Sequence, residues 1–181
     1  IFYKEKIKFQ NVIIQSDKEL DLKWEKKISK SKFNIGLAWS GSFNGVNEPF
    51  RSVPLKTLKR ILTLNANFYC LQNEIWESDL EDFMTSNLVD CREHKLNEIA
   101  SVIRNLDLVL TSDTSLLHLS CSLNKETWGM LCLYPDWRWG EFNKINPYSS
   151  LKIFKQENFN DWSNVEKKNF NELKFKINNK Y

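Results

Sequence analysis

Short apolar runs alternate with amphipathic segments along the chain from Phe33 onward. Each apolar run has the length of a single β-strand and is bounded by polar or turn-forming residues. The pattern predicts strands at Asn34 to Trp39, Asn67 to Leu71, Leu88 to Asp90, Asp107 to Thr111, Glu126 to Leu133 and Leu151 to Lys155. It predicts helices that start near Ser52, Asn73, Leu96, Asp113 and Asp161. Strands that alternate with helices at this spacing predict an α/β fold with a three-layer, doubly wound and mostly parallel sheet.

The two ends of the chain differ from this pattern. Residues 1–32 predict a connector with a charged helix over Ser16 to Lys30, and residues 33–181 form the predicted domain. After Asp161, a tail rich in lysine and asparagine predicts a closing helix that frays. Its predicted apolar anchors are Trp162, Val165, Phe170, Leu173, Phe175 and Ile177. The first residue is not methionine, and the sequence begins partway through a pattern of apolar and charged residues. We therefore expect the chain to be one part of a larger protein.

Composition narrows the class of protein. The 181 residues are 41% hydrophobic and carry a formal net charge of +3 with both signs interspersed, which gives no electrostatic case for nucleic acid or membrane surfaces. No signal peptide or membrane span is visible. The four cysteines form no C-x-x-C pair, so we predict free thiols in a cytoplasmic protein. Two lone histidines and scattered cysteines lack the spacing of metal ligands.

The segment from Asn105 to His118 carries the clearest functional signal. A buried apolar strand runs directly into Ser112, Asp113, Thr114 and Ser115, which are residues that start helices. The first amides of a helix have no partner within it, and the helix dipole is positive at that end. The segment therefore predicts an anion site and favours a ligand that carries a diphosphate.

Polar residues also follow two other predicted strands, and ligands of open α/β sheets bind beyond the carboxyl ends of strands. The long loop from Ser40 to Ser52 contains Gly41 and Arg51, which predict close backbone approach and a bidentate phosphate contact; a merely flexible loop is the alternative. Gln72 is suited to a ribose or base edge, or to a polar helix cap.

Three further candidates have open interpretations. His118 lies four residues after Thr114 on the same helix face and points toward the ligand, or it is a half-buried packing residue. Asp113 binds sugar hydroxyls or caps the helix, because a carboxylate repels a phosphate. The segment Trp137-Arg138-Trp139 offers aromatic faces for a sugar or base, or it packs in the core or a lid.

These motifs in this order carry a family resemblance. The set is Ile35-Gly-Leu-Ala-Trp-Ser-Gly41, Arg51-Ser-Val-Pro-Leu55, Phe68-Tyr-Cys-Leu-Gln72, Ser112-Asp-Thr114 with His118, and Pro135-Asp-Trp-Arg-Trp139. It resembles the carboxyl-terminal, donor-binding half of heptosyltransferase-like glycosyltransferases, especially those joined to tetratricopeptide repeats. The resemblance covers residues 33 to 175 and implies a Rossmann-like half of the GT-B fold. It also implies a nucleotide-diphospho-sugar as substrate and no cofactor or metal.

The resemblance implies a role for each site residue. Ser40, Gly41 and Arg51 would contact the diphosphate, and Gln72 would lie near the nucleoside. Asp113 would meet the sugar, Thr114 and Ser115 the phosphates, with His118 nearby and Trp139 as a weaker member. Asn124 stands where the family has a helix-ending glycine, and asparagine tolerates that left-handed position.

The acceptor site and the general base of such transferases lie in an amino-terminal domain outside this resemblance. The chain alone is therefore expected to be inactive, with that domain or a tetratricopeptide-repeat module as partner. The alternative function is a non-catalytic interaction or ligand-binding module, a relic of such a transferase, because an α/β fold by itself implies no activity.

Overall fold

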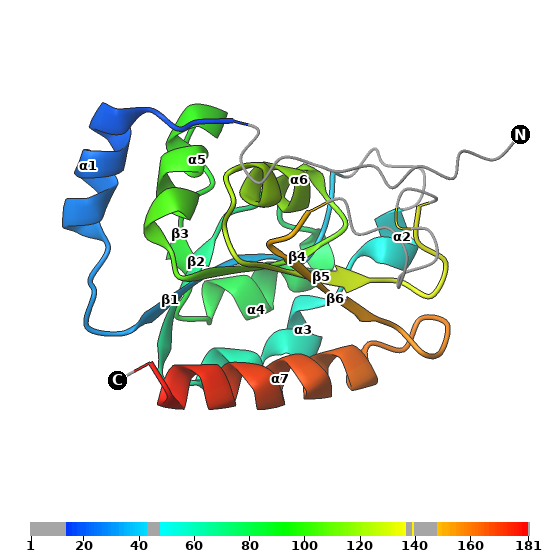
Figure 1. The fold of residues 1–181 in the computed structure, drawn as a ribbon. Coiled ribbons are helices and arrows are strands. Elements are labelled where there is room, and N and C mark those ends of the chain that lie inside the picture. Colours follow the sequence, from blue (N-terminus) through cyan, green and yellow to red (C-terminus); the bar gives the residue numbers. More distant parts are fainter. Residues whose placement is uncertain (1–13, 43–47, 137–138, 140–147, 181) are drawn as a thin grey trace, which may run out of the picture.

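Six strands form one parallel sheet in the order β3-β2-β1-β4-β5-β6 (Figure 1). The structure is a computed structural model that describes residues 14–42, 48–136, 139 and 148–180. The strands are β1 Phe33–Ala38, β2 Ala66–Cys70, β3 Val89–Asp90, β4 Leu108–Ser112, β5 Thr127–Leu131 and β6 Leu151–Lys155. The chain runs outward from β1 to β3 and then crosses back to β4. The predicted doubly wound α/β fold is confirmed, and the strand order reverses between β1 and β4.

Helices cover both faces of the sheet (Figure 1). One face carries α1 Lys18–Lys27, α5 Leu96–Asn105 and α6 Ser115–Ser122, and the other carries α3 Leu55–Leu58, α4 Leu80–Met84 and α7 Ser163–Asn178. Three short helices complete the described elements: α2 Glu48–Arg51 and the 3-10 turns η1 Ile61–Thr63 and η2 Glu77–Asp79. No helix among the described residues is long and apolar enough to span a membrane.

The alternation of side chains along β1 explains the two cores. Ile35 and Leu37 are fully buried on the side of α3, α4 and α7, whereas Ala38 packs with the residues under α1 and α5. A side chain at Gly36 would meet methyl groups of Leu71 at 2.5 Å and Leu106 at 2.7 Å. Any larger residue at this position would have to displace these buried leucine side chains, so packing favours glycine here.

Some predicted boundaries were wrong, and hydrogen bonds explain why. The strand predicted to reach Leu133 ends at Leu131, because the Leu133 amide donates to the side chain of Gln156 and not to a neighbouring strand. The helix predicted near Ser52 begins at Leu55, since the Val53 amide is held by the Trp39 carbonyl at 2.7 Å.

The helices that were predicted at Asn73 and Asp113 also start later. The first is replaced by η2 and α4, which begin at Glu77 and Leu80. The second, α6, begins at Ser115 with Thr114 as its N-cap, so Asp113 is not the cap. At both places a side chain that precedes the helix has a partner elsewhere. Gln72 accepts from the Trp39 amide, and Asp113 accepts from the Trp139 indole.

The predicted connector and tail contain helices that pack on the domain. In α1, Trp24 and the C-cap Ile28 are buried under α5, and the Asp17 carboxylate caps the helix by accepting from two backbone amides. In α7, Val165, Leu173 and Ile177 face the sheet, but Phe175 is 73% exposed. The prediction of Phe175 as an anchor was wrong, because it lies off the buried stripe of α7.

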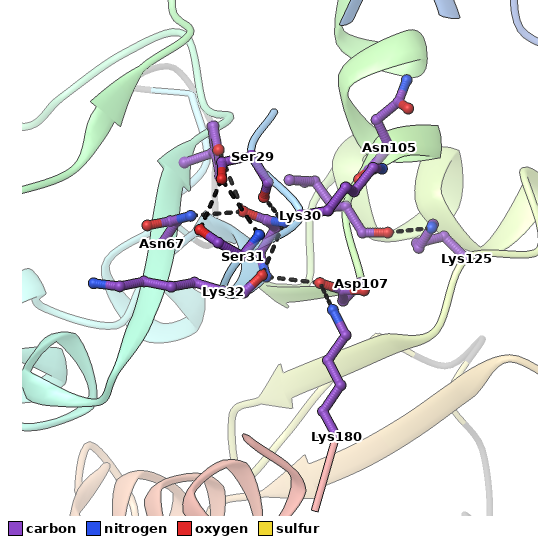
Figure 2. Close-up of polar contacts among 12 residues, drawn as sticks. Ser29, Lys30, Ser31, Lys32, Asn67, Asn105, Asp107, Lys125 and Lys180 are labelled. Carbon is purple, nitrogen blue, oxygen red and sulfur yellow. Dashed lines mark hydrogen bonds and ion pairs between the residues drawn. The ribbon is translucent and has the colours of Figure 1, made fainter. Parts of the chain in front are cut away.

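A polar cluster closes the amino-terminal edge of the sheet (Figure 2). The buried Asn34 side chain donates to the carbonyls of Ser29 and Lys32 and accepts from Asn67. The Asp107 carboxylate accepts from the Asn34 amide at 2.8 Å and pairs with Lys180 at 2.7 Å. This edge is therefore occupied by structural hydrogen bonds, which leaves the opposite, carboxyl-terminal edge for a ligand.

Lys125 belongs to the same edge and is the most buried lysine of this cluster. Its ammonium donates to the carbonyls of Arg104 at 3.0 Å and Leu106, at the end of α5. Burial lowers the pKa of Lys125 from 10.5 to about 8. Between these two pH values the unfolded chain holds a proton that the folded chain releases, so this lysine makes stability rise with pH in that window.

We expect Lys125→Met to remove this pH dependence. The difference in free energy of unfolding, wild type minus variant, should rise by about 2.5 kcal/mol between pH 8 and pH 10.5, with Lys167→Met on the exposed side of α7 as control. Urea unfolding at several pH values measures it. Buried thiols also titrate in this range, but they cancel in the difference. Parallel profiles for wild type and Lys125→Met would contradict the assignment.

Candidate functional site

A cavity of about 540 Å³ lies at the carboxyl ends of β1, β2 and β4, where the strand order reverses. Such a switch point is the usual ligand site of an open α/β sheet. The predicted substrate-binding residues that line it are Ser40, Gly41, Arg51, Gln72, Asp113, Thr114, Ser115 and His118. Only Trp139, of the predicted set, does not line it. The fold thus brings together side chains that are far apart in the sequence.

Gln72 holds the start of the loop that follows β1. Its Oε1 accepts from the backbone amides of Trp39 at 2.8 Å and Ser40 at 3.1 Å. Its Nε2 donates to Ser40 Oγ at 2.9 Å and to the Glu74 carbonyl at 2.8 Å. The side chain is 4% exposed, so its polar atoms are occupied within the protein. The structure therefore places Gln72 as a residue that shapes the cavity wall.

A second buried side chain, that of Asp79, holds residues at both ends of the same loop. One carboxylate oxygen accepts from the Trp39 indole at 2.8 Å and the other accepts from the Leu55 amide at 3.0 Å. The Trp76 indole donates to the Gly41 carbonyl at 3.2 Å. Sequence reasoning missed Asp79 and Trp76, because a carboxylate and an indole in a short helical segment give no periodic signal.

The amino terminus of α6 faces the cavity. The N-cap Thr114 makes no capping hydrogen bond with its side chain, and its hydroxyl lies 3.3 Å from that of Thr111. Ser115, the first helical residue, is exposed. The first amides of α6 are therefore not engaged by a side-chain cap, and with the helix dipole they suit an anion.

Asp113 is fixed by a buried tryptophan. The Trp139 indole donates to Asp113 Oδ2 at 2.8 Å, and the Trp139 ring stacks on the His118 ring with centroids 5.4 Å apart. His118 Nδ1 lies 3.0 Å from the hydroxyl of Tyr148. These contacts orient the carboxylate and the imidazole, which both line the cavity.

Trp139 is 1% exposed, so its faces are not available to a sugar or base. Of the interpretations left open by the sequence, the structure places it in the core, behind Asp113 and His118. Trp137 and Arg138 lie outside the described residues, as does the loop segment 43–47. Asn124 has φ of 56°, so the left-handed conformation predicted for it is confirmed.

An apolar wall and a histidine complete the cavity. Leu71, Leu96, Ile99 and Leu116 provide the wall, and His94 stands beside it. His94 Nδ1 is 3.1 Å from Glu98 Oε2, and its ring meets Trp24 of α1 edge-on at 5.0 Å. No sequence motif marks His94 as a site residue, since it lies in a polar loop.

None of the four cysteines is among the residues that line this cavity. All four cysteines are free and buried. Burial raises the pKa of Cys70 to about 12 and the pKa values of Cys91 and Cys121 to about 11, so these thiols stay protonated at neutral pH and are poor nucleophiles. Among the described residues, no group of three or more His, Cys, Asp or Glu side chains could hold a metal ion.

Comparison with known proteins shows the fold. Neither protein-family profiles nor curated sequences give a match. Among solved structures, E. coli ADP-heptose lipopolysaccharide heptosyltransferase II is similar with a TM-score of 0.58 at 12% identity, over 90% of this chain and 53% of that chain. A family 9 glycosyl transferase from Veillonella parvula DSM 2008 is similar with a TM-score of 0.57 at 14% identity, over 79% of this chain and 42% of that chain.

The E. coli heptosyltransferase WaaC, solved with ADP, has a TM-score of 0.59 at 11% identity, over 85% of this chain and 48% of that chain. A structure of WaaC with ADP-2-deoxy-2-fluoro heptose is also similar. The chain thus spans about half the length of the solved structures it matches. The predicted resemblance to half of a heptosyltransferase is confirmed at the level of the fold.

Proposed function

We propose that this chain is the donor-binding half of a metal-independent glycosyltransferase whose substrate is a nucleotide-diphospho-sugar. The observation that carries the proposal is that one cavity is lined by the start of α6, which has no side-chain cap, by Arg51 and by a fixed carboxylate. A phosphate suits the first two groups, and sugar hydroxyls suit the carboxylate. The fold shared with heptosyltransferases, one of them solved with ADP, supports the same class of ligand.

The groups have distinct places along such a ligand. The apolar wall formed by Leu96 and Ile99 suits the nucleoside, and Arg51 and the amides of α6 suit the diphosphate. Asp113, held by Trp139, suits the sugar that follows. His118, which lines the cavity beside the start of α6, suits the phosphates or the sugar next to them.

Glycosyl transfer breaks the bond between the anomeric carbon and the phosphate oxygen, and the electron pair leaves with the nucleoside diphosphate. A hydroxyl of the acceptor forms the new bond and gives its proton to a base. In this proposal, Arg51 and α6 stabilise the negative charge on the leaving diphosphate, which is an electrostatic and not a covalent role. The acceptor site and the base would come from the other half of the enzyme.

Isothermal titration of the chain with ADP, UDP and GDP, first without metal and then with magnesium, tests the proposal. We expect saturable binding of one nucleotide without metal. Thr114→Ala should weaken it about tenfold, because one hydrogen bond to a charged phosphate is lost. Thr85→Ala, at the end of α4 and away from the cavity, is the matched control and should bind as the wild type does.

Failure of all three nucleotides to bind would contradict the proposal and favour a non-catalytic module. Binding that requires magnesium would contradict the metal-independent part alone. Equal nucleotide affinities for wild type and Thr114→Ala would mean that the phosphates do not lie at the start of α6.

A further inference from the structure

A second cavity of about 280 Å³ adjoins the first and shares two residues with it. Arg51 and Asp113 line both cavities, so the two spaces meet at these side chains. In the proposed function, the diphosphate lies at Arg51 and the sugar begins at Asp113. A ligand that fills the first cavity with its nucleotide would therefore extend its remaining part into the second.

Three exposed aromatic side chains line the second cavity. The rings of Phe50 and Phe159 contact each other with centroids 5.6 Å apart, although 48% and 58% of these side chains are exposed. Tyr134, with 78% exposed, lines the same cavity. Aromatic residues gathered at the rim of a cavity while open to solvent are typical of a binding surface.

A structured turn holds Phe159 in this position. Asn158 and Asp161 form an antiparallel bridge across the turn, and the Asp161 amide donates to the Asn158 carbonyl at 3.2 Å. Asn160 adopts φ of 56°, a left-handed conformation that few residues tolerate. The Asp161 carboxylate in turn accepts from the Ser163 amide at the start of α7. These contacts order the turn that carries Phe159, whose ring lies beside that of Phe50.

Two carboxylates line the same cavity. Asp113 is 5% exposed and has Oδ2 fixed by the Trp139 indole, while Asp136 lies at the exposed rim. Carboxylates accept hydrogen bonds from hydroxyl groups, and an aromatic face covers the apolar side of a pyranose ring. Aromatic rings and carboxylates that line one cavity suit the apolar face and the hydroxyl groups of a sugar.

We propose that the second cavity holds the sugar ring of the donor, with Phe159 and Phe50 as residues that recognise it. This inference rests on the proposed function, because it assigns the sugar of the same ligand. The sugar is one with several free hydroxyl groups, which Asp113 and Asp136 bind, and one apolar face, which the aromatic pair covers. Of the two cavities, the aromatic pair lines only the second, so a nucleotide held in the first would not contact it.

The test compares a nucleotide with its sugar conjugate. Isothermal titration would use ADP and ADP-glucose, or UDP and UDP-glucose if UDP is the nucleotide that binds, with wild type, Phe159→Ala and Phe50→Ala. We expect each variant to weaken binding of the sugar conjugate by roughly three- to tenfold, and to leave the affinity for the nucleotide alone within about twofold. Phe175→Ala, an exposed phenylalanine on α7 that lines neither of these cavities, is the control.

The outcomes separate this inference from the proposed function. If the nucleotide binds but Phe159→Ala and Phe50→Ala change neither affinity, the sugar site is elsewhere and the inference is overturned. Equal weakening of nucleotide and conjugate would also overturn it, because the aromatic pair would then support the whole site. If no nucleotide binds to the wild type, the proposed function fails first. Urea unfolding of each variant verifies that the native fold is retained.

Discussion

Replacing Gln72 with leucine is expected to lower the free energy of unfolding by about 3 kcal/mol and to abolish nucleotide binding. The leucine fills a similar volume but removes four hydrogen bonds, to Trp39, Ser40 and Glu74. The amides of Trp39 and Ser40 would stay buried without their acceptor, and each unsatisfied group costs about 1–3 kcal/mol. The start of the loop that lines the cavity would then lose its position, so the ligand site would be lost with it.

Gln156→Leu is the matched control for this variant. Gln156 follows β6 as Gln72 follows β2, and it is similarly buried. Among the described residues, its Oε1 accepts one hydrogen bond, from the Leu133 amide, and its Nε2 has no hydrogen-bond partner. We expect a loss of only about 1 kcal/mol for Gln156→Leu, with the affinity for the nucleotide retained.

Urea unfolding, analysed with one m-value for all variants, measures the change in free energy of unfolding, and isothermal titration measures the change in nucleotide affinity. If Gln72→Leu is as stable as Gln156→Leu, the four hydrogen bonds do not position the loop. If it is destabilised but still binds the nucleotide, the loop is not part of the ligand site.

Arg51→Ala is expected to weaken the binding of a nucleoside diphosphate by about 30-fold, which corresponds to about 2 kcal/mol. Arg51 lines both cavities at the point where they meet, which is where the proposed diphosphate lies. A guanidinium binds phosphate oxygens through two parallel hydrogen bonds, and hydrogen bonds to charged groups are the stronger kind. Arg51→Ala removes a positive charge from the place where, in the proposed reaction, negative charge develops on the leaving diphosphate.

Arg51→Lys separates charge from geometry. A lysine ammonium keeps the positive charge but cannot form the bidentate contact, so we expect an affinity between those of wild type and Arg51→Ala. Arg60→Ala serves as the unrelated control, because the Arg60 guanidinium lies over the Phe170 ring and near Glu166 on the α7 side of the sheet. A nucleotide affinity that is the same in wild type and Arg51→Ala would remove the diphosphate from this junction.

Local sequence patterns were sufficient to predict the fold class and most of the residues proposed for the cavity. The apolar runs predicted the six strands, because a strand buried on both faces needs continuous apolar residues. Parallel strands place their carboxyl ends at one edge of the sheet. The residues after three of them, Ser40, Gln72 and Asp113, therefore had to meet once the fold class was known.

The sequence by itself therefore determined the α/β class, the strands and the edge of the sheet at which the candidate site lies, because periodicity and strand direction are properties of short segments. Only the tertiary structure decided that the hydrogen-bonding groups of the Gln72 side chain are occupied by the loop after β1. It likewise decided that Trp139 is buried and donates to Asp113. It also decided that Phe159 meets Phe50 at a second cavity. Each of these contacts joins residues that are distant in the chain, and the partner of a side chain across such a distance is set by packing and not by local sequence.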